Sequence, residues 1–362
     1  IDRLEEDFVG LFGYLGGGEV KNLTLNNVDI VGKDNVGALA GDYYSGHLSN
    51  NHASGSVVGN TNVGGLVGVM SYINTIIEDS TAEVNVTGYE NVGGLVGKSG
   101  AGTSTVTIMN SHALGNVEGQ INVGGLGGYA VGGRYENSLA VGSVSVVGDS
   151  MGDTLGGLIG FAEGTAVEKC FAAGMLSGTT NVGGLVGILK EPGKIAYSYS
   201  TSNIFGNSGI GGLVGQYTGA AAGEMYMLAS YAAGGITGNS DMAGLVGRAN
   251  LAGTIKHSFW DMVLNELNDA VNGEAVLEFA EGRSSDEMKS EVNYYPEYII
   301  HWDFDTTWTI NGTDNAGYPA LAWQGFVHDA SDIYTIYTST AGGSVEITPS
   351  RVHALEGIEI FV

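Results

Sequence analysis

Small and large apolar residues alternate with polar ones at period two through most of the chain. The phrase Ser-x-Ala-x-Gly-x-Val occurs at Ser111–Val117 and Ser138–Val144. Relatives of this phrase begin at Asn51, Ser80, Cys170, Ser198 and Ser230. Because no 3.6-residue apolar period runs through these segments, the pattern predicts short strands and argues against helical repeats.

A second phrase, Asn-Val-Gly-Gly-Leu-Val-Gly, recurs along more than two thirds of the chain. Identical copies lie at Asn62–Gly68, Asn91–Gly97 and Asn181–Gly187. Variants lie at Asn35–Gly41, Asn122–Gly128, Thr154–Gly160, Gly209–Gly215 and Asp241–Gly247, with a looser opening copy at Asp7–Gly13. The final glycines of successive copies are 27 to 32 residues apart, so each period is predicted to hold two or three short strands joined by tight turns.

Strands this thin bury their apolar face only if successive periods stack. Stacking at roughly 4.8 Å places Val on Val and Leu on Leu, and nine coils would make a rod roughly 40 to 45 Å long. The sequence therefore predicts an all-β fold, a parallel β-helix-like β-solenoid of about nine coils of 27 to 32 residues. An aromatic-rich capping region is expected to follow the solenoid.

The glycines and asparagines of the repeated phrase suit the corners of such coils. Corners need positive φ or close backbone approach, which glycine accepts without strain. Asn35, Asn62, Asn91 and Asn122 are expected to stack as a side-chain amide ladder. The ladder is expected to be interrupted at Thr154, Gly209 and Asp241.

The Gly-Gly-Leu-Val-Gly phrase, together with its Ser-x-Ala-x-Gly strand, resembles the GLUG repeat of bacterial and archaeal surface proteins. The resemblance covers residues 1–256. Proteins with such repeats include large adhesin-like proteins, and similar repeats occur outside the catalytic part of immunoglobulin A proteases. The resemblance implies an extracellular, non-enzymatic scaffold.

The pattern changes after Lys256, so the domains are predicted as a solenoid at 1–256, a capping region at 257–326 and the incomplete start of a separate β-repeat module at 327–362. Ser284 or Ser285 is expected to begin a short helix with acidic residues in its first turn. The order Phe-Trp-Asp, Met-Lys, Trp-Asp-Phe and Gly-Tyr-Pro resembles the ending that follows GLUG arrays. A cap is physically required, because an open coil end exposes backbone groups and apolar side chains.

Charge removes two classes of function. Thirteen basic residues against 39 acidic ones give a net charge of -26, which repels phosphate backbones and anionic lipid headgroups. Nucleic-acid binding is therefore not expected. No apolar run is long enough to span a bilayer, so direct membrane insertion is not expected either. Cys170 cannot form an internal disulfide and is expected to be a buried small residue.

No pattern in the sequence assigns catalytic, cofactor-binding or metal-binding residues. His52 and His112 are expected at equivalent outward positions two coils apart, roughly 10 Å, which is too far to share a metal. The acidic stretch around Glu274–Glu287 lacks the spacing of a calcium loop, so a solvated surface is favoured there over a Ca²⁺ site. Asn22, Asn85 and Asn311 begin formal N-glycosylation sequons.

The most distinctive surface feature expected from the sequence is an aromatic column. It follows the Ser position of each coil, and its last four members are Phe171, Tyr199, Tyr231 and Phe259. Stacked in register, these rings could bind a glycan, contact another protein or pack against the cap. Packing is favoured, because the column becomes aromatic as it nears the cap, and buried rings would exclude ligand binding.

Together these patterns indicate a non-catalytic extracellular surface protein whose solenoid serves as a stalk, spacer or assembly unit. One alternative is a carbohydrate- or protein-binding module that uses a solenoid face, and another is the non-catalytic part of a large secreted protease. The partners expected are other surface proteins, further copies of the chain or glycans. The chain is expected to be an excerpt of a longer protein.

Overall fold

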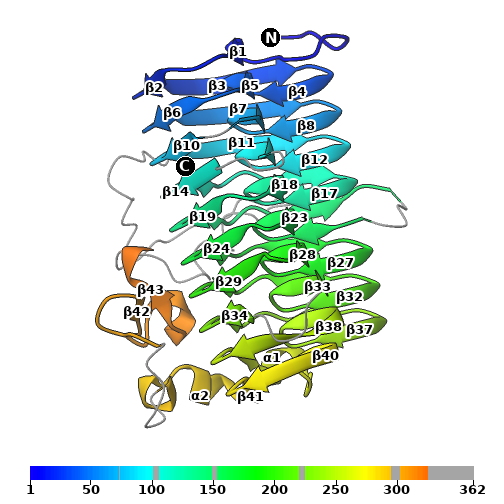
Figure 1. Cartoon of the computed structure of the whole chain (residues 1–362), viewed down its shortest axis with the longest axis vertical. Helices are drawn as coiled ribbons and strands as arrows, with labels where there is room; N and C mark the ends of the chain where they lie inside the picture. The colour runs from blue at the N-terminus through cyan, green and yellow to red at the C-terminus, as the bar shows by residue number, and fades with distance from the viewer. Residues whose placement is uncertain (73, 101–105, 149–152, 220–224, 295–301, 325–362) are drawn as a thin grey trace, which may run out of the picture. The chain divides into compact units, whose positions relative to one another are not determined.

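Successive coils stack on one another through parallel strand pairs. The structure is a computed structural model that describes residues 1–72, 74–100, 106–148, 153–219, 225–294 and 302–324. It divides into unit 1, Ile1–Ser284, and unit 2, Ser285–Val362. Unit 1 contains three parallel sheets that run the length of the stack (Figure 1), which confirms the predicted β-solenoid of about nine coils.

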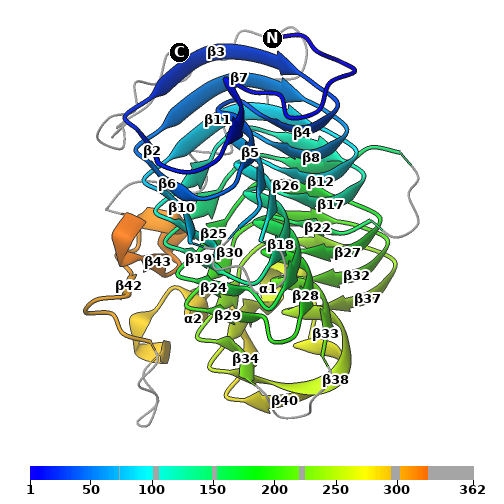
Figure 2. The ribbon, with the colours of Figure 1, turned by 45° about the horizontal axis from the view of Figure 1, so that its top comes forward.

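The first sheet, sheet A, carries the Ser-x-Ala-x-Gly strands. Figure 2 shows its first three strands side by side in successive coils. Its undivided strands are β3 (Thr24–Val31), β7 (His52–Val58) and β11 (Thr81–Thr87). In later coils each strand is divided into a first half, β15 (His112–Ala113), β20 (Leu139–Ala140), β25 (Phe171–Ala172), β30 (Tyr199–Ser200), β35 (Tyr231–Ala232), β39 (Phe259–Asp261) and β41 (Glu281–Arg283). The second halves are β16 (Val117–Gly119), β21 (Val144–Val146), β26 (Met175–Ser177), β31 (Asn203–Phe205) and β36 (Ile236–Thr237).

Sheet B is formed by the first half of the repeated glycine phrase. Its strands are β4 (Asp34–Gly37), β8 (Thr61–Gly64), β12 (Glu90–Gly93), β17 (Ile121–Gly124), β22 (Leu155–Gly156), β27 (Thr180–Gly183), β32 (Ser208–Gly211) and β37 (Ser240–Ala243). Equivalent residues of the phrase pair directly, so that Val63 opposes Val92 and Gly64 opposes Gly93.

Sheet C contains two strand columns that join at its last two strands, β38 (Val246–Lys256) and β40 (Val271–Glu278). The first column holds the end of the glycine phrase in β1 (Phe12–Leu15), β5 (Ala40–Tyr43), β9 (Val67–Met70), β13 (Val96–Ser99), β18 (Gly127–Val131), β23 (Ile159–Glu163), β28 (Val186–Lys190) and β33 (Val214–Thr218). The second column holds β2 (Glu19–Lys21), β6 (Gly46–Ser49), β10 (Thr75–Glu78), β14 (Val106–Met109), β19 (Arg134–Glu136), β24 (Ala166–Glu168), β29 (Lys194–Ala196) and β34 (Met225–Leu228).

A coil therefore has four or five strands, not the two or three predicted. The chain between the glycine phrase and the next Ser-x-Ala phrase forms the second strand column of sheet C. Its residues differ from coil to coil, because only the inward positions are constrained to be apolar. This strand column therefore carries no repeated phrase by which the sequence could reveal it.

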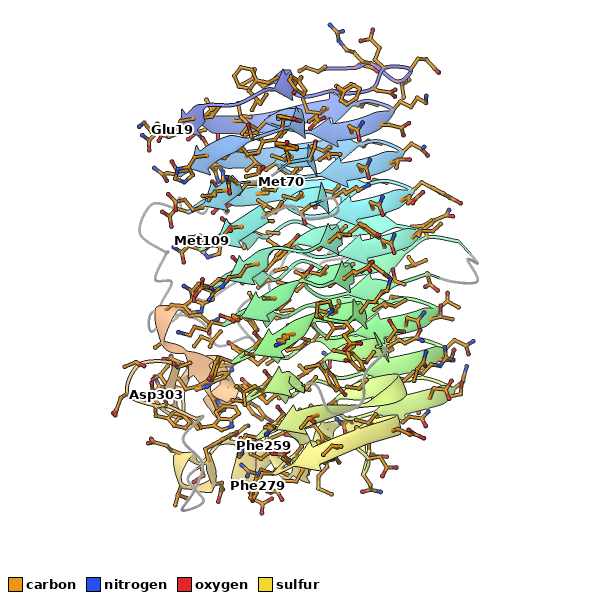
Figure 3. All side chains as sticks on the ribbon, viewed as in Figure 1. Glu19, Met70, Met109, Phe259, Phe279 and Asp303 are labelled. Carbon is orange, nitrogen blue, oxygen red and sulfur yellow. The ribbon has the colours of Figure 1, made fainter. Side chains whose placement is uncertain are left out.

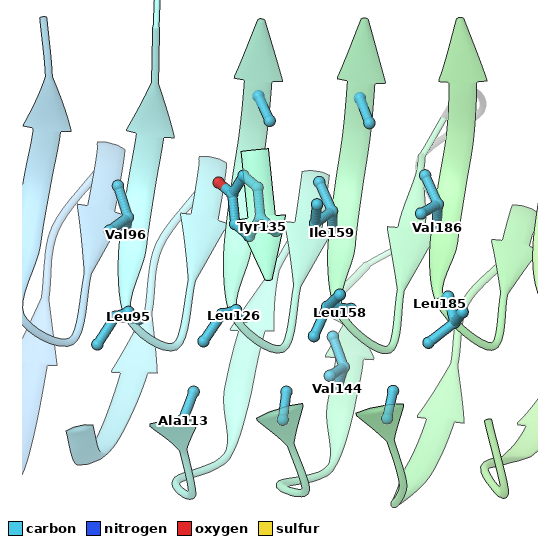
Figure 4. Close-up of a cluster of buried hydrophobic side chains, with 14 of the residues drawn as sticks. Leu95, Val96, Ala113, Leu126, Tyr135, Val144, Leu158, Ile159, Leu185 and Val186 are labelled. Atoms are coloured by element: carbon cyan, nitrogen blue, oxygen red, sulfur yellow. The ribbon is translucent and has the colours of Figure 1, made fainter. Parts of the chain in front are cut away.

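The core is a set of stacked identical or similar side chains. Leu95, Leu126, Leu158 and Leu185 lie above one another in successive coils, and all four are fully buried (Figure 4). Beside them Val67 pairs with Val96 and Ile159 pairs with Val186, and Gly127 separates these two apolar pairs in the same column. The predicted stacking of Leu on Leu and Val on Val is thus confirmed along the middle of unit 1.

The glycines of the phrase allow sheets B and C to approach each other with backbone against backbone. A Cβ atom added to Gly97 would lie 2.5 Å from the carbonyl carbon of Asn62 and from the amide nitrogen of Val63. A Cβ added to Gly64 would lie 2.0 Å from the carbonyl oxygen of Val67. Neither glycine has a positive φ, so close approach is the reason for these glycines.

The backbone has positive φ at the asparagine position of the phrase, also where Gly209 or Asp241 replaces the asparagine. Asn62 and Asn91 both have φ of 56°, a conformation that Asn adopts more readily than most residues. The predicted amide ladder is present, with Nδ2 to Oδ1 distances of 2.7 Å from Asn62 to Asn35, and of 2.8 Å from Asn91 to Asn62 and from Asn122 to Asn91. The hydroxyl of Thr154 donates to Asn122 Oδ1 at 2.7 Å and adds one step to the ladder, but the ladder stops there as predicted, because the side-chain oxygen of Asn181 in the next coil accepts no hydrogen bond among the described residues.

A second ladder of buried serines links the coils before sheet A. Ser198 Oγ donates to the carbonyl oxygen of Ala196 at 2.8 Å and accepts the backbone N–H of Cys170 at 3.0 Å. The equivalent bonds recur at Ser80, Ser111, Ser138, Ser230 and Ser258. Cys170 occupies one position of this ladder and is fully buried, as predicted. Burial raises the pKa of its thiol to about 12, so the sulfur stays protonated.

The stack continues one coil beyond Lys256, where the sequence placed its end. β40 pairs in parallel with β38, and β41 pairs in parallel with β39. Trp260 replaces the small inward residue of earlier coils, opposing Ala232 before it and Gly282 after it. Its indole donates to the carbonyl oxygen of Leu267 at 2.9 Å, and the turn α1 (Met262–Asn265) follows. A large apolar ring thus fills the last described coils of unit 1.

Unit 2 has its own aromatic cluster. Tyr294, Trp302 and Trp308 are buried, and the rings of Trp302 and Trp308 stack with centroids 4.5 Å apart. Its elements are α2 (Ser285–Met288), the 3₁₀ turns η1 (Glu291–Tyr294), η2 (Asp314–Gly317) and η3 (Ala322–Gln324), and the antiparallel pair β42 (Trp308–Thr309) and β43 (Ala320–Leu321). The predicted short helix is therefore confirmed, whereas the module predicted at 327–362 lies outside the described residues.

The close approach of the sheets predicts that Gly97→Ala destabilises the solenoid by about 3 kcal/mol, because the new methyl group meets rigid backbone atoms. Gly235→Ala is the matched control, since its Cβ would meet the side-chain oxygen of Asn203 at 3.2 Å and would lie at an ordinary contact distance of 3.9 Å from the backbone oxygen of Leu264. Urea unfolding followed by circular dichroism measures both variants. Equal losses for the two variants would contradict the backbone-contact explanation.

The serine ladder predicts that Ser198→Ala costs about 1 to 3 kcal/mol, because the buried N–H of Cys170 loses its acceptor. Cys170→Ser is expected to change stability by less than about 1 kcal/mol, since serine already occupies this position in neighbouring coils. Thermal and urea unfolding of both variants provide the measurement. If Ser198→Ala is as stable as the parent chain, the ladder contributes nothing to stability.

Candidate interaction surface

The aromatic column predicted from the sequence is in register but buried. Phe171 pairs with Tyr199 and Tyr199 pairs with Tyr231, with ring centroids 4.5 and 4.8 Å apart. Phe171 is 4%, Tyr199 1%, Tyr231 0% and Phe259 1% exposed. A glycan or protein partner cannot reach rings buried to this extent. Their burial is the outcome expected for packing, and it argues against the ligand surface considered from the sequence.

The end of this aromatic column meets a cation. The guanidinium carbon of Arg283 lies 3.4 Å from the ring centroid of Phe259, which lies in the last coils of the stack (Figure 3). Arg283 also bonds Glu281, two residues before it, at 3.0 Å. The geometry is that of a cation–π contact, which stabilises the packed end of the column.

The polar start of the same column contains His52, Thr81 and His112, paired in that order in successive coils. The two histidines therefore stand at equivalent positions two coils apart, as predicted. Removal of water from the imidazole lowers the pKa of His112 to about 4, against a smaller opposing effect of Asp79. His112 is consequently neutral near pH 7.

A different column forms the partly exposed face of sheet C. Each of its members directly follows the final glycine of the repeated phrase, and we call it the post-glycine column. Its members, in chain order, are Tyr14, Asp42, Val69, Lys98, Tyr129, Phe161, Ile188, Gln216 and Arg248. They pair with one another across the eight strands of the first column of sheet C and the shared strand β38.

Alternation along each strand turns the post-glycine column outward. Ala130 and Ala162, each next to a column member, are fully buried, whereas Tyr129 and Phe161 are partly exposed. The rings of Tyr129 and Phe161 stack 4.9 Å apart at an angle of 5°. Lys98 Nζ lies 5.7 Å from the centroid of Tyr129, so a cation adjoins this aromatic pair.

A second group of exposed rings flanks the start of the post-glycine column. Tyr44 and Tyr72 stack with centroids 4.5 Å apart, and Tyr14 lies 6.1 Å from Tyr44 at a tilt of 42°. Tyr14 is 57% and Tyr72 45% exposed. Because stacked rings cover one another's faces, the group presents mainly ring edges and hydroxyls to a partner.

Charged side chains on sheet C form ion pairs between neighbouring coils. Lys190 bonds Glu163 at 2.8 Å, and Lys256 bonds Glu278 at 2.7 Å. Arg134 contacts both Glu136 and Glu168, which keeps two carboxylates of adjacent coils from facing each other unpaired. These exposed pairs contribute little stability each. Apolar side chains on this face are concentrated in the post-glycine column, at Tyr14, Val69, Tyr129, Phe161 and Ile188.

Sequence reasoning missed the post-glycine column, although its positions are marked by the repeated phrase. The column that follows the Ser position is more conspicuous in the sequence, because its aromatic residues are consecutive. Period-two alternation alone does not tell which face of a strand points outward when the chain turns within the phrase. The signal that could have found this column is the residue after each final glycine, where Tyr129 and Phe161 are adjacent in register.

Other chemical features do not assemble into a site. Within the described ranges, no group of three or more His, Cys, Asp or Glu side chains is placed to hold a metal ion. Asn22 and Asn85 are exposed, whereas the side-chain oxygen of Asn311 accepts the backbone N–H groups of Thr313 and Asp314 in a local turn. No helix in the described part of the chain is long and apolar enough to cross a membrane.

Comparison with known proteins gives partial matches. No family model matches the chain. The sequence is 43% identical to halomucin of Haloquadratum walsbyi over 86 residues, which are 24% of this chain and 1% of halomucin. The crystal structure of a proposed immunoglobulin A1 protease from Bacteroides ovatus aligns over 85% of this chain and 76% of its own, at 16% identity and a TM-score of 0.39. The chain thus matches only a small part of halomucin.

Burial of His112 predicts a pH-dependent stability. The folded pKa of about 4 lies below the unfolded value of 6.5, so the unfolded chain binds an extra proton between these values. This contribution to stability is fully present above pH 6.5 and is lost as the pH falls toward 4. His112→Gln should reduce the loss between pH 7 and pH 4.5 by about 2 kcal/mol, measured by urea unfolding at each pH. Parallel stability curves for the variant and the parent would contradict this.

Proposed function

We propose that the chain is a GLUG-type, non-catalytic part of an extracellular surface protein in which the solenoid serves as a stalk or spacer. The observation that carries the proposal is the parallel pairing of sheets A and C from the first coil to the last coil of unit 1, which local register shifts in β3, β34 and β38 do not end. Every coil bonds only its two neighbours, so length is added by repeating the unit without altering the rest.

The side-chain ladders support the stalk role, because they join successive coils. Amides join consecutive coils from Asn35 to Asn122, and serines join them through the second half of unit 1. These bonds supplement the backbone ladders between coils, so the coils resist separation along the stack axis. The similarity of an 86-residue stretch to halomucin is compatible with a surface or secreted location.

The location is tested by treating intact cells of the source organism with a protease and identifying the released peptides by mass spectrometry. Peptides from 1–284 are expected before lysis, because a surface stalk is reachable from outside. A cytoplasmic protein from the same cells is the control and should stay intact. Recovery of this chain only after lysis would overturn the proposed location.

The spacer role predicts that removal of one whole coil is tolerated. Deletion of residues 69–97 joins Gly68 to Lys98, so that Gly68 takes the place of the equivalent Gly97 and the register is preserved. The chain should therefore fold and reach the cell surface at parental levels. Deletion of 75–88, which removes β10 and β11 alone, is the control and should abolish folding. Circular dichroism and surface labelling measure both. Loss of surface display from the whole-coil deletion, with folding retained, would instead indicate a specific role for that coil.

A further inference from the structure

Two copies of the post-glycine column placed side by side in antiparallel directions would bring opposite charges together. The eight members from Asp42 in β5 to Arg248 in β38 have the aromatic pair Tyr129 and Phe161 at their centre and opposite charges at their two ends, and Tyr14 lies one coil beyond Asp42. Seven spacings separate these charges, about 34 Å at the usual distance between paired strands. A two-fold contact pairs each residue with its counterpart at the same distance on the other side of the axis, so two opposite charges at equal distances from the centre would meet each other.

We propose that two copies of this chain associate through their post-glycine columns, antiparallel, about a two-fold axis between Tyr129 and Phe161. This inference does not depend on the proposed location or on the spacer role. The contact places Asp42 opposite Arg248, Val69 opposite Gln216, Lys98 opposite Ile188, and Tyr129 opposite Phe161 of the second copy.

Asp42 and one N–H group of Arg248 are available for this contact. No basic side chain in the described ranges pairs with Asp42, whose Oδ1 accepts the hydroxyl of Ser71. Arg248 forms an ion pair with Asp241 of its own chain through Nε and Nη2, and Nη2 also donates to Ser208, whereas Nη1 has no acceptor among the described residues. A carboxylate of a second copy can therefore reach the guanidinium without breaking these bonds.

The centre of the interface offers apolar contact. Stacking of Tyr129 on Phe161 within one copy leaves the edges of both rings exposed, and ring edges pack well against the rings of another copy. The aliphatic part of Lys98 can lie along Ile188 of the second copy while its ammonium group stays in water. Both contacts are repeated by the two-fold axis, so each is made twice.

Net charge sets the conditions for association. Two chains of charge -26 repel each other, and this repulsion extends about 10 Å at 0.1 M salt but only about 3 Å at 1 M. Salt should therefore strengthen the dimer, because the long-range repulsion is screened more than the close apolar contact. A purely ionic interface would weaken under the same change.

Sedimentation velocity of the full chain at 1 to 100 μM, in 0.1 M and 1 M NaCl, tests the proposal. A monomer–dimer equilibrium is expected, with a dissociation constant at least tenfold lower in 1 M NaCl. A chain that stays monomeric in both salts up to 100 μM overturns the proposal. Assemblies that grow beyond dimers would also overturn it, because a two-fold contact closes on itself.

Substitutions locate the interface. Phe161→Asp should raise the dissociation constant at least a hundredfold, whereas Tyr89→Asp, at an exposed tyrosine 45% accessible and outside the column, should leave it unchanged. Thermal unfolding of each variant confirms that the chain is folded. Dimers that persist in a folded Phe161→Asp variant would show that another surface is used.

Charge reversal tests the antiparallel arrangement. Asp42→Arg and Arg248→Asp should each raise the dissociation constant about tenfold, since each places like charges opposite one another. The double variant restores opposite charges and should return to within about threefold of the parent. If the double variant is as weak as the single ones, Asp42 and Arg248 do not face each other and the two-fold arrangement is wrong.

Discussion

The structure of unit 1 depends on one contact, the crossing of two backbones at the glycines of the repeated phrase. At Gly97 there is no room for a methyl group against Asn62 and Val63, and the same is true at Gly128 against Asn91. Glycine therefore returns at this point in successive coils from Gly13 to Gly247, while other positions can vary. This steric requirement explains why the glycine phrase recurs along the sequence.

The same crossing explains the polar ladders inside an otherwise apolar stack. For the chain to turn into the crossing, the residue before the valine adopts a left-handed conformation, and the register of sheet B pairs the residues on either side of it. Asparagine tolerates that conformation and joins neighbouring coils through its side chain. Buried serines do the same before sheet A, where a backbone N–H would otherwise lack an acceptor. These ladders satisfy the polar groups that the turns remove from the sheets.

The features that depend on repeated phrases could be predicted from the sequence, whereas the strands without a repeated phrase could not. The register, the Asn35 to Asn122 ladder and the burial of Cys170 follow from equivalent positions in the phrases, because parallel stacking makes equivalent residues neighbours. The second strand column of sheet C was missed because only its alternation is kept, not its residues. The last coil was missed for a related reason, since Val271–Glu278 alternates without the glycine phrase. Which aromatic column is buried depends on the turn between strands, and alternation does not encode it.

In each coil a residue with positive φ lies at the corner before sheet A, and the residue type at this corner varies while the backbone conformation stays the same. All ten of its members have φ between 43° and 57°. The first five, Asn22, Asn50, Asp79, Asn110 and Asn137, are polar and form amide contacts, whereas the last two, His257 and Phe279, stack as rings. Since the outward residues do not determine the backbone, each outward column can change its chemistry along the stack. Partner recognition is therefore to be sought in outward columns, and among them the post-glycine column combines exposure, an apolar centre and opposite end charges.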